Sequence, residues 1–194
     1  VENNGYVESE FDFDASTGTI TSYNGYATYL AIPETIGGAP VKAIGPEAFA
    51  RHAYLAFLEL PEGLESIGDS AFYNCETLGR VRFPSTLKTI GSNAFYNAYK
   101  SSVLELTSVE RIGDYAFYGC TALEKIEGIE SATAYGNQAF AYTGFKAFAI
   151  PAAVTQIASM ISSGSSEIYP YGQNVFAGCK ALTEITVAAE NANY

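Results

Sequence analysis

The sequence has no tryptophan, one histidine, one methionine, and ten basic residues against 21 acidic ones. The resulting net charge of −11 argues against a nucleic-acid ligand, whose phosphates need a basic surface, and against electrostatic docking on an anionic membrane. No apolar run reaches the roughly 18 residues of a membrane-spanning helix. The chain starts at Val1 without a recognisable signal peptide, so we expect that an upstream segment was either cut off or left out, which is compatible with export but does not establish it.

Residue patterns that carry chemistry are also scarce. With His52 as the only histidine, a nucleophilic triad lacks a base, and neither a phosphate loop nor a zinc-type spacing is present. Residues 12–18 faintly resemble a calcium loop, but Tyr23 stands where a bidentate Glu is needed, so we favour a polar turn between two strands. Carboxylate pairs for glycoside hydrolysis stay open, without a pocket-forming segment to support them. The sequence therefore predicts no catalytic residue, metal site or cofactor.

What the chain does contain is a repeat. The pattern Ile-Gly-x-x-Ala-Phe-x-x-Cys returns about every 23 residues, with Tyr or Val in places. Its phenylalanines are Phe49, Phe72, Phe95, Phe117, Phe140 and Phe176. A fixed period of this length indicates a solenoid, in which each coil buries its apolar face against its neighbours. An aromatic ring in every coil favours a structural ladder over a binding track.

The three cysteines share one position of the repeat, three residues after the phenylalanine. This slot holds Cys75, Cys120 and Cys179, and in other coils His52, Ala98 and Thr143. Coils stacked at about 4.8 Å place Cα atoms two repeats apart at roughly 10 Å, beyond the limit of about 7 Å for a disulfide. We interpret all three cysteines as buried free thiols that pack as small apolar groups, and His52 as a filler of the same slot.

A second pattern, Leu-x-x-Ile-x-Leu-Pro-x-x-Leu-x-x-Ile in idealised form, follows each cysteine position. The alternation in residues 81–83 predicts a short strand with one face inward, and Pro84 ends it because proline lacks an amide proton. The Leu-x-x-Ile step suits a second short extended segment on another side of the coil. Residues 68–75 predict one helical turn, capped by Asp69 or Ser70.

These motifs resemble the BspA-like leucine-rich repeat family over roughly residues 30–187, and residues 18–41 are similar to the entry segment of such proteins. We expect a leucine-rich-repeat solenoid, a curved right-handed coil of short parallel β-strands and short helical turns. The expected parts are an N-terminal β cap at 1–30, about six repeats of 22–23 residues at 31–187, and a tail at 188–194 that resembles the start of a further repeat.

Three departures from the repeat stand out. An extra residue occurs near Lys100 to Ser102, and the repeat at 123–139 has Gly128 where others have the strand-ending proline. About fourteen additional residues form an insertion at 158–171. Its serine-rich stretch predicts a flexible loop.

Two surfaces are candidates for binding. Outward positions of the predicted strands carry mixed charge: Phe57, Glu59, Arg80, Arg82, Glu105, Lys125 and Glu127. These charges either pair across strands or present two arginines to an acidic partner, and solenoids commonly bind through their extended concave surface. Tyr73, Tyr96 and Tyr118 each follow a ladder phenylalanine and form a predicted column on one edge. The column suits contact with a protein or glycan, or it is a self-stacked stripe that shields the coils.

The resemblance implies a non-enzymatic bacterial module, on the cell surface or secreted, that adheres to host proteins or surface glycans. A different class of function stays open: the repeats are a structural spacer or scaffold in a larger multi-domain surface protein or enzyme. The sequence alone does not separate the two, because a shared fold does not transfer a ligand.

Overall fold

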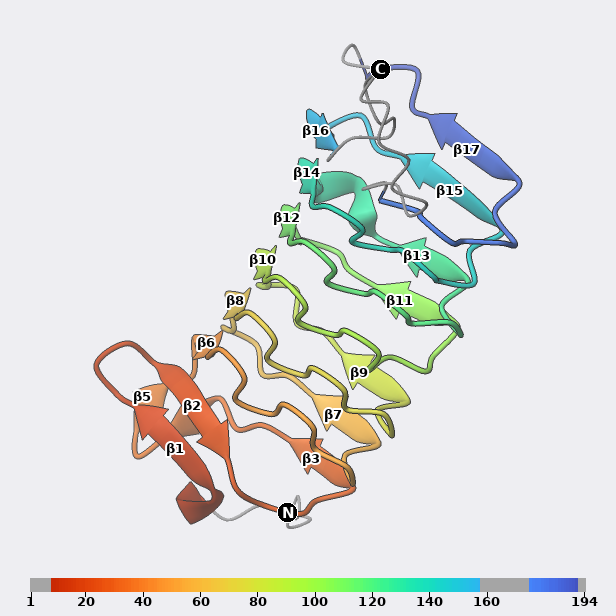
Figure 1. Ribbon diagram of the computed structural model, residues 1–194. Coiled ribbons are helices and arrows are strands. Elements are labelled where there is room, and N and C mark those ends of the chain that lie inside the picture. The colour runs from red at the N-terminus through yellow and green to blue at the C-terminus, as the bar shows by residue number, and fades with distance from the viewer. Residues whose placement is uncertain (1–7, 158–174, 192–194) are drawn as a thin grey trace, which may run out of the picture.

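A computed structural model describes residues 8–157 and 175–191. The chain winds into successive coils, and between residues 29 and 157 each coil carries a strand of three or four residues on one side and a two-residue strand on the other (Figure 1). Stacking of the coils lines these strands up in two arrays along the length of the molecule. The predicted leucine-rich-repeat solenoid is thereby confirmed as the fold class.

The array of short strands is a single sheet of eight strands in the order β1-β2-β6-β8-β10-β12-β14-β16. Its members are β1 (Phe11–Asp14), β2 (Thr19–Tyr23), β6 (Ala43–Ile44), β8 (Ser66–Ile67), β10 (Thr89–Ile90), β12 (Arg111–Ile112), β14 (Ala134–Tyr135) and β16 (Gln156–Ile157). All pairings are parallel except the β1–β2 hairpin. The Leu-x-x-Ile step therefore forms the second extended segment that the sequence predicts.

The array of longer strands is divided into three sheets, β3-β7-β9, β11-β13 and β15-β17. Its members are β3 (Tyr29–Ala31), β7 (Phe57–Glu59), β9 (Arg80–Arg82), β11 (Val103–Glu105), β13 (Lys125–Glu127), β15 (Ala147–Ile150) and β17 (Glu184–Val187). The first break follows the extra residue near Lys100. The second follows Gly128, whose φ of 74° leads into the short 3-10 helix η2 (Ile129–Ser131). Both sequence departures thus coincide with interruptions of the strand ladder.

The N-terminal region adds two hairpins. After the 3-10 helix η1 (Glu8–Glu10), β1 and β2 are joined by a turn in which the Asp14 carboxylate accepts hydrogen bonds from the Ser16 amide (2.9 Å) and hydroxyl (2.6 Å). This is the polar turn favoured over a calcium loop. Strands β4 (Thr35–Ile36) and β5 (Ala39–Pro40) form the second hairpin, between β3 and β6, around two glycines with positive φ.

The expected helical turn in each coil is wrong. In the coil around Phe72, residues 69–74 form consecutive β-turns, and Ser70 has a φ of 56°. The Phe72 amide donates to the Ala94 carbonyl oxygen of the next coil at 2.8 Å. Alternate amides bond in this way to the next coil, which the closed hydrogen bonding of a helix does not allow. Asp69 likewise accepts from the amide of Ser92 in the next coil, at 2.7 Å, and does not cap its own turn.

The ladder phenylalanines occupy the centre of the solenoid. From Phe49 to Phe176, successive ring centroids lie 5.0, 5.0, 5.3, 5.9 and 6.0 Å apart, with interplanar angles of 22° or less. Tyr23 of β2 extends the stack, 5.1 Å from Phe49. Contacts of this kind between neighbouring coils supply the interface term in the stability of a solenoid.

The cysteines are free thiols, and their role is more specific than filling space. The Cys75 Sγ atom donates to the Phe49 carbonyl oxygen at 2.9 Å, and Cys120 donates to that of Phe95 at 3.2 Å. Cys179 does the same with Phe140 but is only partly buried, which corrects the expectation of full burial. Burial raises the pKa of Cys75 to about 11 and that of Cys120 to about 12, so both thiols stay protonated at neutral pH.

Three sequence-based expectations lie outside the described residues. They concern the insertion at 158–171, the first seven residues of the expected cap, and the end of the tail at 192–194.

Candidate binding surface

The outward side of the array of longer strands, β3 to β17, is called the strand face below. Near its N-terminal end it carries a row of aromatic and cationic side chains. Parallel pairing sets Tyr29 of β3 beside Phe57 of β7, and Phe57 beside Arg80 of β9. The rings of Tyr29 and Phe57 lie 5.1 Å apart, and the Arg80 guanidinium carbon lies 5.7 Å from the Phe57 ring centroid. The row exposes aromatic surface beside a cation that has no carboxylate partner among the described residues.

A second aromatic pair precedes these strands by three residues. Tyr26 and Tyr54 are 79% and 58% exposed, and their rings meet edge to face at 5.9 Å. Sequence analysis missed this pair and Tyr29. The recurrence of Tyr26-x-x-Tyr29 as Tyr54-x-x-Phe57 was the available signal, but the β4–β5 hairpin lengthens this coil and takes the pair out of the 23-residue period. Exposed aromatics with a neighbouring arginine are typical of interaction sites.

The remaining charges of this face are partly paired. Arg82 contacts Glu59 at 3.1 Å across β7 and β9, and Lys125 contacts Glu127 within β13. Solvent-exposed pairs such as these contribute little to stability. Glu105 stands in register with Glu127, and neither pairs across the strands. Cross-strand pairing therefore accounts for Arg82 but not for Arg80 or Glu105.

Each break in the strand array opens a groove on this face. Between β9 and β11 lies a pocket of about 320 Å³. It is lined by Arg80, Arg82, Phe83, Tyr99, Ser101, Val103 and Glu105. The break between β13 and β15 opens a wider groove of about 980 Å³, where Ile126, equivalent to the buried Leu104 of β11, is only partly buried. The strand face thus combines exposed side chains with recesses.

The tyrosine column forms as a continuous stack. Tyr96 lies 5.0 Å from Tyr73 and 4.6 Å from Tyr118, measured between ring centroids. Arg51 covers one end at 5.7 Å, and Tyr142 covers the other at 5.0 Å. Burial, followed by the neighbouring tyrosines, raises the pKa of Tyr118. Because the rings mostly cover one another, these contacts favour the shielding role over a binding track.

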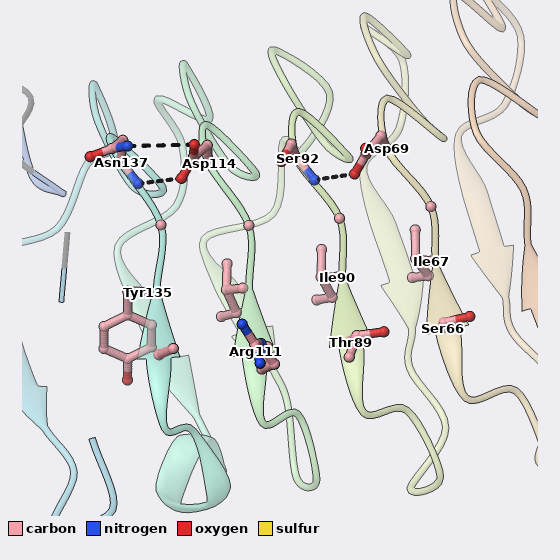
Figure 2. A pocket seen from close by; sticks show the side chains of 16 residues that line it. Ser66, Ile67, Asp69, Thr89, Ile90, Ser92, Arg111, Asp114, Tyr135 and Asn137 are labelled. Carbon is pink, nitrogen blue, oxygen red and sulfur yellow. Dashed lines mark hydrogen bonds between the residues drawn. The ribbon is translucent and has the colours of Figure 1, made fainter. Parts of the chain in front are cut away.

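The short-strand sheet carries a shallow trough of about 590 Å³, which sequence analysis did not anticipate (Figure 2). Figure 2 shows Arg111 on this sheet and, at the strand ends, Asp69 turned toward Ser92 and Asp114 toward Asn137. Asp114 accepts from the Asn137 amide at 2.7 Å, so its carboxylate is engaged in joining coils. Tyr135, the aromatic residue in its lining, is buried, so the trough offers no exposed ring, and its carboxylates join neighbouring coils.

His52 has a structural position. Its Nε2 atom lies 2.7 Å from the Gly25 carbonyl oxygen, and its ring lies 5.1 Å from that of Tyr23. No cluster of three or more His, Cys, Asp or Glu side chains suited to a metal ion occurs within 8–157 and 175–191. Over the same ranges, no helix is both long and apolar enough to cross a membrane.

Comparison with known proteins identifies the family. The family model described as BspA type leucine rich repeat region matches residues 42–169 in six copies, and the chain belongs to this family. A search of curated proteins gave no match.

Among solved structures, a leucine rich cell surface protein from Faecalibacterium prausnitzii A2-165 is 28% identical, with a TM-score of 0.62; the match covers 94% of this chain and 54% of that one. The pneumococcal vaccine antigen PcpA is 20% identical, with a TM-score of 0.69, over 89% of this chain and 46% of that one. A leucine rich repeat protein of T. pallidum is 22% identical, with a TM-score of 0.61, over 93% of this chain and 81% of that one. PcpA and the T. pallidum protein, both below 25% identity, show the fold alone. This chain spans about half the length of the Faecalibacterium protein and of PcpA.

Proposed function

We propose that this chain is a non-enzymatic interaction module of a bacterial cell-surface or secreted protein, and that it binds host proteins or surface glycans through its strand face. The observation that carries the proposal is the row Tyr29–Phe57–Arg80 with the exposed Tyr26 and Tyr54 beside it. Folding does not explain this surface, because the equivalent outward positions on β15 are Ala147 and Ala149.

Two further observations support the proposal. The 28% identical Faecalibacterium protein is a leucine rich cell surface protein. Repeat solenoids offer long, rigid surfaces whose outward residues vary without cost to the core, which suits partner binding. The carboxylates of Asp69 and Asp114 at the trough accept hydrogen bonds from the next coil, and His52 lies against a backbone carbonyl, so these groups serve the fold and are not arranged with a nucleophile.

The experiment is binding of the purified chain to an array of extracellular-matrix proteins and surface glycans. The control is a repeat protein of the same net charge, and binding that this control shares is assigned to nonspecific electrostatic retention. Specific, saturable binding to at least one array member is expected. Silence across the array, with the control equally silent, would contradict the proposal and favour the spacer or scaffold role.

A further inference from the structure

The pocket between β9 and β11 has the chemistry of a small-molecule site. Its volume of about 320 Å³ lies at the lower end of the usual range for such sites, roughly 300–1,000 Å³. That space suits one ring-sized group rather than a chain. The pocket also adjoins the aromatic row, because Arg80 lines the pocket and stacks on Phe57.

The floor of the pocket is fixed by the core. Tyr99 is buried, and its ring meets those of Phe95 and Phe117 edge to face, both at 6.4 Å. The Tyr99 hydroxyl donates to the Val103 carbonyl oxygen at 2.9 Å, and the Ser101 hydroxyl donates to the same oxygen at 3.1 Å. A pocket built on a buried side chain and satisfied hydrogen bonds is preorganised, which lowers the entropic cost of binding.

The rim of the pocket carries both signs of charge without neutralising them. Arg80 and Arg82 line one side, and Glu105 lines another. Arg82 is paired with Glu59, whereas Arg80 and Glu105 form no ion pair within residues 8–157 and 175–191. Arginine binds carboxylates through parallel hydrogen bonds, and an ionised glutamate accepts hydrogen bonds from hydroxyl groups.

We propose that this pocket binds the acidic residue of a glycan, a sugar ring that carries a carboxylate together with hydroxyl groups. The carboxylate binds Arg80, the ring hydroxyls donate to Glu105, and the apolar edge of the ring packs on the Phe83 wall. A simple carboxylate fits less well, because it brings negative charge near Glu105 with no donor between them. The inference rests on the proposed function, since it names the ligand class of the same strand face.

The test is a titration of the isotope-labelled chain with single sugars, followed through amide chemical shifts. The probes are glucuronic acid, its neutral analogue glucuronamide, and acetate. Glucuronic acid is expected to shift the amides of Ser101, Val103 and Glu105 saturably, and at least about tenfold more tightly than either other probe. Arg80→Gln should weaken this binding by at least about tenfold. Arg111→Gln, in the sheet of short strands on the opposite side of the coils, should leave it unchanged.

Three results would overturn the inference. Equal binding of acetate would mean a general anion site, and equal binding of glucuronamide would mean that the carboxylate plays no part. Absence of any shift with glucuronic acid would mean that the pocket takes no acidic sugar. If glucuronic acid causes no shift but the chain binds a member of the panel of proteins and glycans saturably, only this inference is refuted. If neither experiment detects binding, the proposed function is refuted as well.

Discussion

The phenylalanine ladder yields a prediction with a definite magnitude. Phe95 is fully buried and stacks on Phe72 at 5.0 Å and on Phe117 at 5.3 Å, with a further edge contact from Phe83 at 5.7 Å. Phe95→Ala removes packing from two coil interfaces at once. Truncation of a buried phenylalanine costs about 3–5 kcal/mol, and we expect the upper half of that range because both faces of the ring lose a stacked partner.

The matched control is Phe57→Ala, the same truncation at a partly exposed position on the strand face. We expect this variant to lose about 1 kcal/mol or less. The assay is urea denaturation followed by circular dichroism, with slopes compared to check that the transitions stay cooperative. If Phe95→Ala lost no more stability than Phe57→Ala, the ladder would not be the stabilising spine of the solenoid.

Three further predictions concern stability. Gly91→Ala should destabilise by about 1–3 kcal/mol in the same assay, because a Cβ atom there would lie 2.7 Å from the backbone nitrogen of Asp69; the control Gly79→Ala, whose nearest contact is 3.6 Å, should have much less effect. Tyr135→Phe should raise the free energy of unfolding by about 1 kcal/mol or more, since it removes a buried hydroxyl that has no hydrogen-bond partner among residues 8–157 and 175–191; a lower free energy of unfolding would contradict this. The free energy of unfolding should be at its full value below about pH 9 and fall as pH rises toward 11, because burial raises the pKa of Cys75 from 9.0 to about 11 and that of Cys120 to about 12; denaturation at pH 8 and pH 10.5 tests this, and Cys75→Ala should make the decline smaller while leaving the part due to Cys120.

The sequence was sufficient to predict the coil and its two strand arrays, because Ile, Leu and Phe recur at positions that must all face inward. It did not predict the turns correctly. Residues 68–75 indicated a helical turn because Asp69 or Ser70 can cap one and because Ala71 and Phe72 would then both face inward. Stacking instead requires alternate amides to bond to the next coil. Such inter-coil hydrogen bonds, seen from Phe72 to Ala94, have no signature within a single repeat.

The binding face was predicted in part. Outward strand positions follow from alternation, so Phe57, Arg80 and Glu105 were identified as candidates. The exposed Tyr26 and Tyr54 were missed, since a hairpin between their coils disturbs the spacing. The extra residue near Lys100 was noticed, but its effect depends on where the hydroxyls of Tyr99 and Ser101 bond in three dimensions.

The most direct test of the account maps binding to the strand face. Arg80→Glu with Arg82→Glu is compared with Lys88→Glu with Arg111→Glu, a double variant with the same change in net charge placed on the short-strand side. Binding to a partner identified on the array is measured for both proteins at the same ionic strength. The account predicts a loss of at least about tenfold for the first pair and little change for the second. Unchanged binding by the first pair, or equal losses by both, would contradict the assignment of this face.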